Sequence, residues 1–148
     1  PVDLGISGED HAAQTILDET ADIHRTGPMR MILASTSSTR LQMLCAAGLT
    51  VDAVAPRVDE AVIRDALVAE GAHPRDIADA LAEMKARKVS DKNPDALVLG
   101  CDQVLALDRD ILSKPNSPDE ARDHLRQLRG RSHKLLSAVV AYEGGQPV

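Results

Sequence analysis

The sequence predicts an α/β fold in which helices flank a twisted mixed sheet. Short apolar segments alternate with segments whose apolar residues recur at helical spacing, a pattern typical of such sheets. The chain has 148 residues, 43% of them hydrophobic, which is enough for one domain with its own core. It contains no Phe or Trp and only one Tyr, so the core must be built from aliphatic side chains.

Local signals place each element in order along the chain. Gly48 ends the first helix because glycine adopts the left-handed cap conformation, and Pro56 ends the second strand. Pro74 suits the first turn of the longest helix. The charged triplet Asp108–Asp110 between apolar segments indicates a tight hairpin, and Ser117 begins a capping box. Strands are therefore expected over 30–34, 50–55, 97–101, 104–107, 111–112 and 135–142, and helices over 38–47, 61–70, 74–89 and 118–128.

The two ends of the chain differ from the middle. Residues 1–28 are polar and acidic and precede Met29–Met31, which is typical of a translation start. We expect them to be an extension, a tag or an upstream segment, partly helical, with a docking helix as the alternative. Residues 29–148 are expected to form the domain. Because the chain ends at Val148, after a turn that should lead into another strand, the sequence also predicts truncation at the C-terminus.

Composition excludes several function classes. The net charge of −6 argues against a general nucleic-acid or anionic-membrane binder, since those affinities depend on clustered cations. No apolar segment approaches the roughly 20 residues of a membrane span and no signal-peptide pattern opens the chain, so a cytoplasmic location is expected. Cys45 and Cys101 lie in apolar surroundings and are expected to be buried, reduced core residues.

Residues 31–40 indicate a phosphate site. They run from an apolar strand into the hydroxyl-rich start of a helix, where unpaired backbone N–H groups and the helix dipole favour an anion. Ser35 stands at this turn, and Arg40 follows where its guanidinium fork can bind the same anion. The alternative is that Ser35 or Ser37 merely caps the helix while Arg40 is a solvated charge.

Further charged residues stand near the ends of predicted elements. Asp102 follows the strand over 97–101, at the carboxyl end of an interior strand, where α/β sheets form ligand crevices. Glu60 follows the second strand. Lys85 shares a helix ridge with small apolar residues and is expected to point along packed surface toward a partner. Lys114 precedes a proline, which favours an extended backbone.

Each of these charges taken alone fits a solvated side chain or a surface ion pair worth under about 1 kcal/mol. Taken together they suit a polyphosphate. Arg40, Lys85 and Lys114 would neutralise its oxygens, and Glu60 with Asp102 would hold a divalent Mg or Mn ion through oxygen ligands. The common nucleotide fingerprints GxxxxGK[ST] and GxGxxG are absent from the chain.

At these residues the chain resembles the Maf family of nucleoside triphosphate pyrophosphatases. Six short motifs match in a consistent order between about residues 31 and 141, and this order is more specific than any one motif. The motifs are Leu33–Arg40 (LASTSSTR), Val58–Glu60 (VDE), Ala82–Ala86 (AEMKA), Gly100–Val104 (GCDQV), Lys114–Pro115 (KP) and Leu125–His133.

The resemblance implies a Maf/ITPase-like fold and metal-dependent hydrolysis between the α and β phosphates of a nucleoside triphosphate, which releases a monophosphate and pyrophosphate. By this resemblance Asp102 would accept a proton from water, bind the metal, or do both, and Glu60 would assist the metal. A homodimer is left open. The residues implied to bind phosphate are Ser35, Arg40, Lys85 and Lys114.

Two positions bear on the base of the substrate. Gln103 follows Asp102 as in the subgroup that resembles the 7-methyl-GTP pyrophosphatase, whereas a subgroup acting on dTTP and UTP carries Thr there and Arg at the position of Thr39. Thr39 is the usual residue of neither subgroup. The resemblance therefore favours a modified nucleotide such as 7-methyl-GTP, with dTTP and UTP as the alternative.

The chain departs from the family pattern in two places. Ser38–Thr39 replaces Pro–Arg, which removes one cation, and the family's C-terminal third, which contributes to the base pocket, has no counterpart here. A second hypothesis is therefore a non-catalytic nucleotide-binding or septum-regulating fragment. A third hypothesis, a structural partner domain, is disfavoured because the charges gather at one sheet end and no exposed apolar stripe is expected.

Overall fold

The computed structural model describes residues 29–148, and the expectations for residues 1–28 lie outside this range. Apart from one merged strand, the predicted elements are present with boundaries shifted by at most two residues. In chain order the elements are β1 (Arg30–Ala34), α2 (Ser38–Ala46), β2 (Val51–Ala53), α3 (Glu60–Ala69), α4 (Pro74–Ser90), β3 (Ala96–Leu107), β4 (Asp110–Leu112), α5 (Pro118–Leu128), β5 (Lys134–Glu143) and β6 (Gln146–Pro147).

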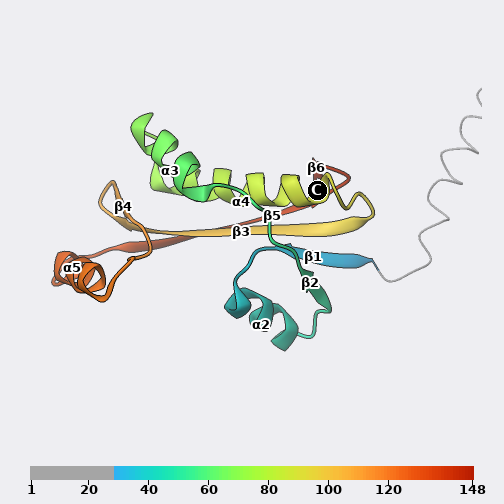
Figure 1. The fold of residues 1–148 in the computed structure, drawn as a ribbon, viewed down its shortest axis with the longest axis horizontal. Coiled ribbons are helices and arrows are strands. Elements are labelled where there is room, and N and C mark those ends of the chain that lie inside the picture. Colours follow the sequence, from blue (N-terminus) through green and yellow to red (C-terminus); the bar gives the residue numbers. More distant parts are fainter. Residues whose placement is uncertain (1–28) are drawn as a thin grey trace, which may run out of the picture.

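The strands form one mixed sheet in the order β2-β1-β3-β5-β6, with β4 paired to β3. β1 is parallel to both β2 and β3, whereas β3 pairs antiparallel with β4 and β5, and β5 pairs antiparallel with β6. The β3–β4 hairpin and α5 lie at the end of the long strands away from β1 (Figure 1). This arrangement confirms the predicted fold class.

Helices lie on both sides of the sheet around β1. Because β2 and β3 are parallel to β1 but lie on opposite sides of it, right-handed crossovers place α2 on one face and α4 on the other, as Figure 1 shows. From β1 the chain thus moves across the sheet to β2 in one direction and then returns past β1 to β3, so the direction of its path reverses beside β1. In such sheets ligands bind beyond the carboxyl ends of the strands at the reversal, and Ser35 directly follows β1 there.

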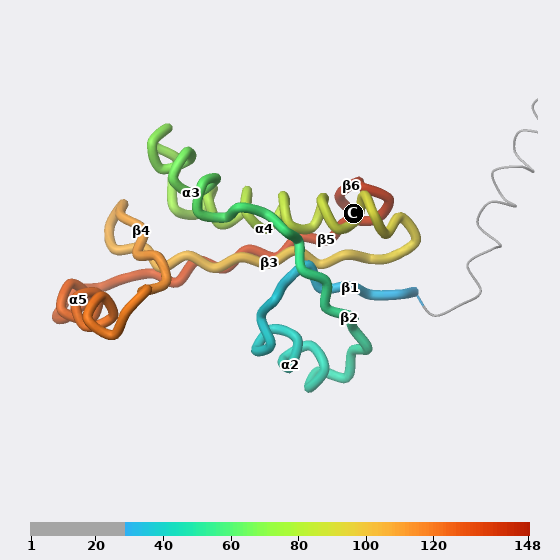
Figure 2. Tube along the Cα trace, in the orientation of Figure 1, coloured from blue at the N-terminus to red at the C-terminus, as the bar shows by residue number. Residues whose placement is uncertain are grey.

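Strand β3 corrects one prediction. The segments 97–101 and 104–107 belong to a single strand of 12 residues, so Asp102 lies in the middle of a strand rather than at its end. The continuous ladder with β5 holds the polar residues in the extended conformation, and Figure 2 shows the two strands running side by side. The neighbouring β1, however, ends opposite Gly100. Asp102 therefore still lies just beyond the carboxyl end of a parallel strand.

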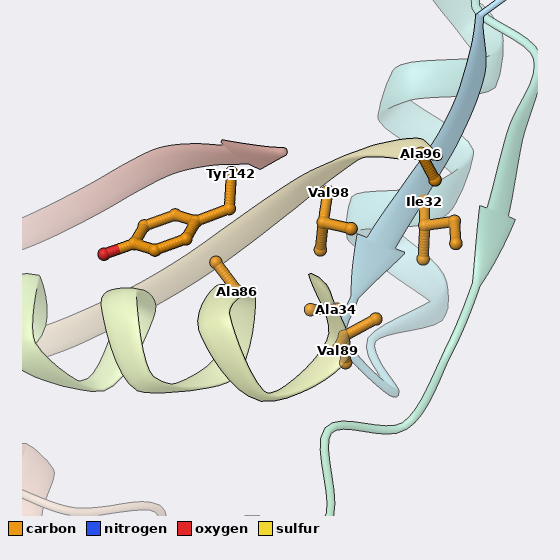
Figure 3. Packing of buried hydrophobic residues seen from close by; sticks show 7 residues of the cluster. All are labelled: Ile32, Ala34, Ala86, Val89, Ala96, Val98 and Tyr142. Carbon is orange, nitrogen blue, oxygen red and sulfur yellow. The ribbon is translucent and has the colours of Figure 1, made fainter. Parts of the chain in front are cut away.

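Helix α4 packs along the sheet and forms the core with it. The one Tyr of the chain, Tyr142, joins this core and donates its hydroxyl to Glu83 Oε1 at 2.7 Å, so the core is otherwise aliphatic, as predicted. Each fully buried Ile or Leu contributes roughly 1.5–3 kcal/mol relative to an exposed one. One cluster, shown in Figure 3, contains Ile32, Ala34, Ala86, Val89, Ala96, Val98 and Tyr142, and a second contains Ile77, Ala78, Leu81, Ala82, Val104 and Ala138.

Helix α4 approaches the sheet closely at Gly100. A Cβ atom at this position would lie 2.1 Å from the carbonyl oxygen of Ala82 and 2.7 Å from the Cβ atom of Ala86. Only glycine permits this contact, since any side chain would push α4 away from β3. Lys85 lies on the same stretch of α4, so this packing also sets the distance between Lys85 and β3.

The other face of β3 and β5 is less well covered, because α4 packs on one face only and alternate side chains of a strand point to opposite faces. Leu135 and Val139 are 61% and 68% exposed, so the expectation of no exposed apolar stripe is wrong.

The two cysteines do not lie in the core. Helix α2 has no buried residue and leaves Cys45 exposed, while Cys101 is half-buried. The prediction that both are buried core residues is therefore wrong. None of the described helices is long and apolar enough to cross a membrane.

Replacing Gly100 tests the close packing of α4. Gly100→Ala is expected to lower the free energy of unfolding by about 2–3 kcal/mol, because a backbone carbonyl cannot move aside as a flexible side chain can. Urea unfolding followed by circular dichroism measures this loss. In the matched control Cys101→Ala, the altered side chain lies on the opposite face and is half-buried. Equal unfolding midpoints for Gly100→Ala and the unaltered chain would contradict the contact.

Candidate active site

An ammonium group bridges two carboxylates at the centre of the candidate site. Lys85 Nζ lies 2.6 Å from Asp102 Oδ1 and 3.1 Å from Glu60 Oε1. The side chains of Lys85 and Asp102 are 4% and 6% exposed, whereas that of Glu60 is 39% exposed. The pair of Lys85 and Asp102 is thus shielded from water, and Glu60 forms the side of the site that faces solvent.

Three separate elements supply these groups. Lys85 comes from the sheet-facing side of α4, and Asp102 from the face of β3 that α4 covers. Glu60 is the first residue of α3, where Asp59 caps the helix by accepting from Val62 N at 3.2 Å. The prediction that Lys85 points along packed surface toward a partner is confirmed, since it is 3% exposed and contacts Asp102.

One oxygen of Asp102 is left without a partner. Oδ2 is buried and accepts no hydrogen bond from any described residue. An unsatisfied buried carboxylate oxygen costs free energy, so such an atom in a native protein calls for a ligand or a chemical role. Its lone pairs are available to a metal ion or to a proton from water.

The turn from β1 into α2 holds Arg40 against the strand that carries Asp102. Ser35 Oγ accepts from Ser37 N at 3.1 Å, and Ser37 Oγ caps the helix by accepting from Arg40 N at 3.3 Å. Arg40 Nη1 donates to Ser35 Oγ at 3.5 Å and to the carbonyl oxygen of Cys101 at 3.4 Å. Ser37 is therefore the helix cap, and Arg40 is half-buried rather than a solvated surface charge.

The charge of Arg40 has no counter-ion. Both acceptors of its guanidinium are neutral oxygens, and no carboxylate of residues 29–148 forms an ion pair with it. At a helix N-terminus the backbone N–H groups and the dipole add to such a charge. Arg40 and the start of α2 therefore form a place where a phosphate would be stabilised.

Three predicted site residues stand apart from this group. Gln103 lies on the opposite face of β3 from Asp102, where its Nε2 donates to Ser137 Oγ at 2.7 Å. Thr39 is exposed in the first turn of α2. Lys114 is exposed after β4 and forms no ion pair within the part of the chain that the structure describes. The residues brought together are Ser35, Arg40, Glu60, Lys85 and Asp102, and their roles stay predictions.

Comparison with known proteins assigns the chain to a family. Residues 30–147 match the family described as Maf-like protein. The chain belongs to the Maf family. The resemblance drawn from the six sequence motifs is thereby confirmed, and all six lie within the matched residues.

Relatives carry names that describe an activity. A Ruegeria pomeroyi protein named "Nucleoside triphosphate pyrophosphatase" is 58% identical over 118 residues, which cover 80% of this chain and 59% of the relative. A Caulobacter vibrioides protein of the same name is 53% identical over 116 residues, covering 78% and 58%. A Mesorhizobium japonicum protein named "7-methyl-GTP pyrophosphatase" is 47% identical over 117 residues, covering 79% and 59%. The chain thus spans about three-fifths of the length of these Maf relatives.

The two carboxylates of the site, Glu60 and Asp102, are suitable ligands for a metal ion whose other ligands are phosphate oxygens and water. Glu60 and Asp102 both contact Lys85 Nζ, so they face one point, and Asp102 Oδ2 has no partner in the described part of the chain. Among the described residues no group of three His, Cys, Asp or Glu side chains could hold a metal. Because Mg²⁺ commonly takes one or two carboxylates and completes its shell with water and phosphate oxygens, the pair fits such an ion together with a phosphate.

The carbonyl oxygen of Cys101 is a site group that the sequence reasoning missed. It accepts from Arg40 Nη1 at 3.4 Å and from Lys85 Nζ at 3.3 Å, so the two cations meet over one oxygen. Every residue has a carbonyl group, and no residue pattern could have marked this one. The bridge from Lys85 to Glu60 was also missed, because the sequence motifs suggested phosphate for the lysine and metal for the glutamate.

Burial raises the pKa of the Cys101 thiol, and the charges of Arg40 and Lys85 oppose this shift only in part. Since the thiolate is the reactive form, iodoacetamide at about pH 8 is expected to alkylate the exposed Cys45 before Cys101. The rate at Cys101 should rise as the pH increases above the ordinary thiol range. Peptide mass spectrometry measures both rates, with labelling in urea as the control. Equal rates in the folded chain would contradict the shielding of Cys101.

Proposed function

We propose that this chain provides the phosphate-binding and catalytic part of a nucleoside triphosphate pyrophosphatase, which hydrolyses the bond between the α and β phosphates. One observation carries the proposal. Within residues 29–148, Arg40 has no counter-ion and stands beside a buried Asp102 that keeps one carboxylate oxygen without a partner. A cation that attracts phosphate and a base that attracts a proton thus share one site. The names of the Maf relatives support this activity.

In this proposal the triphosphate binds at the start of α2. The guanidinium of Arg40 donates two hydrogen bonds to phosphate oxygens, and the Ser35 hydroxyl with the free N–H groups of the first helical turn adds further donors. Lys85 contributes a second cation from the opposite face of the sheet. Lys114, which lies in the exposed segment after β4, is the third cation proposed to bind the phosphates.

Asp102 acts as the general base. A water oxygen forms a bond to the α-phosphorus, the bond from that phosphorus to the bridging oxygen breaks, and the bridging oxygen leaves with pyrophosphate. Asp102 Oδ2 accepts the proton that the water releases. In the nucleotide-free chain Lys85 holds Oδ1 at 2.6 Å and so fixes the position of the carboxylate before substrate binds. Such proton transfer contributes typically about 10²–10⁴ in rate.

A divalent Mg or Mn ion is part of the proposal. Asp102 and Glu60 would hold it together with phosphate oxygens, because hard cations of this type prefer oxygen ligands. When bound, such an ion offsets the negative charge that develops on the phosphate oxygens.

The finer proposal concerns the base. We infer that the substrate is a modified nucleotide such as 7-methyl-GTP, with dTTP and UTP as the alternative. Gln103 supports the modified guanine through the subgroup resemblance, as does the relative named "7-methyl-GTP pyrophosphatase". A cytoplasmic location and a homodimer stay predictions from the sequence.

Hydrolysis of a small panel of nucleotides tests both proposals. The chain is incubated with Mg²⁺ or Mn²⁺ and 7-methyl-GTP, GTP, dTTP or UTP, and the products are identified by phosphorus NMR. Pyrophosphate with a monophosphate is expected, fastest from 7-methyl-GTP. Turnover of dTTP and UTP alone would reject the modified guanine but keep the activity. Nucleotide binding without turnover in either metal would reject the enzyme and favour the non-catalytic hypothesis.

Removing the proposed base should affect the chemical step. Asp102→Asn is expected to lower kcat by about 10²–10⁴, because an amide oxygen does not take a proton from water at neutral pH. The matched control is Asp79→Asn, which removes the same charge from an exposed position on α4 and should leave kcat unchanged. Thermal unfolding of both variants checks that they fold. An Asp102→Asn variant that retains more than about a tenth of kcat would exclude Asp102 as the base.

Removing Lys114 should affect substrate binding alone. Lys114→Ala is expected to raise KM about tenfold, since one charge-assisted contact to phosphate is worth roughly 1.5 kcal/mol. The unfolding temperature should not change, because Lys114 is exposed and has no ion pair among the described residues. Lys92→Ala, another exposed lysine near the C-terminus of α4, is the control. An unchanged KM for Lys114→Ala would place this lysine outside the phosphate site.

A further inference from the structure

The ammonium group of Lys85 occupies the point that the two metal-binding carboxylates share. It lies 2.6 Å from Asp102 Oδ1 and 3.1 Å from Glu60 Oε1, and its third contact is the Cys101 carbonyl oxygen at 3.3 Å. In the structure, therefore, a side chain of the protein itself already neutralises the carboxylates that a divalent ion would need.

We propose that Lys85 is an internal counter-cation that keeps the metal site closed until nucleotide binds. Its ammonium leaves the carboxylates when a phosphate arrives, and the divalent ion then takes its place. Metal binding is consequently weak without nucleotide and strong with it. This inference rests on the proposed function, since it concerns the order in which the same site receives its ligands.

Electrostatics makes the two cations compete. A magnesium ion bound to both carboxylates would approach their oxygens to about 2.0–2.1 Å, within the space that the ammonium now fills. Like charges this close repel strongly in a site shielded from water, where Lys85 is 4% exposed and Asp102 6% exposed. The ammonium must therefore move before the ion binds both oxygens.

The structure also provides a place to which Lys85 can move. The Cys101 carbonyl oxygen contacts both Lys85 Nζ and Arg40 Nη1, so a phosphate bound by Arg40 lies within a short movement of the ammonium. The lysine side chain has four rotatable carbon bonds and three donors, which suits such an exchange of partners. Arg40 does not compete for the carboxylates, because its guanidinium contacts only neutral oxygens among residues 29–148.

Metal binding in the absence of nucleotide tests the proposal directly. Mn²⁺ is titrated into the nucleotide-free chain, and the free ion is measured by electron paramagnetic resonance. Lys85→Gln removes the competing charge but keeps an N–H donor for Asp102 Oδ1, and it is expected to bind Mn²⁺ about tenfold more tightly than the unaltered chain. An affinity equal to that of the unaltered chain would overturn the proposal.

Lys88→Gln is the matched control. Lys88 lies on the same helix and the variant loses the same charge, but its ammonium donates to the carbonyl oxygen of Arg57 rather than to a carboxylate. Its Mn²⁺ affinity should equal that of the unaltered chain. If Lys88→Gln tightens binding as much as Lys85→Gln does, the effect comes from net charge and the proposal is rejected.

Thermal unfolding covers the case in which Lys85→Gln folds poorly. Millimolar Mn²⁺ should raise the unfolding temperature of Lys85→Gln more than that of the unaltered chain, or restore folding if the variant is unfolded without metal. A variant that Mn²⁺ neither stabilises nor refolds contradicts the exchange. These measurements need no nucleotide, so a chain that fails to release pyrophosphate rejects the proposed function without deciding the behaviour of Mn²⁺.

Discussion

A carboxylate in the middle of a long buried strand is tolerated only while a cation lies against it. Asp102 is such a carboxylate, and Lys85 is the cation, 2.6 Å away. Removing Lys85 would leave the charge of Asp102 unpaired among the described residues in a site shielded from water, which is far more costly than losing an exposed ion pair. The constraint extends to the backbone, because α4 reaches β3 closely enough for this contact only where Gly100 has no side chain.

The site combines one paired and one unpaired cation. Lys85 neutralises Asp102 and part of Glu60, whereas Arg40 has no carboxylate partner among residues 29–148. Both cations contact the carbonyl oxygen of Cys101, although they come from helices on opposite faces of the sheet. The reversal of strand order at β1 makes this meeting possible, since it places one helix on each face beside the same strand end.

The two faces of β3 serve different purposes. Side chains at alternate positions enter the core or reach Lys85, as Val98 and Asp102 do, while the remaining positions face the less covered side. Gln103 belongs to that second side, and its amide is held by Ser137 rather than directed at Asp102. Lys85 and Asp102 are therefore separated by the plane of the sheet from Gln103, the residue proposed to distinguish bases.

The sequence by itself determined most of the elements and the identity of the charged residues. Glycine, proline and capping residues act within a few positions, so β1 and α5 were predicted with their observed bounds, and the six ordered motifs indicated the Maf family. Only the tertiary structure decided that β3 runs unbroken through Asp102, that Cys45 is exposed, and that Lys85 bridges Asp102 and Glu60. These features depend on the ladder with β5 and on the packing of α4, which join residues far apart in the chain and leave no local pattern.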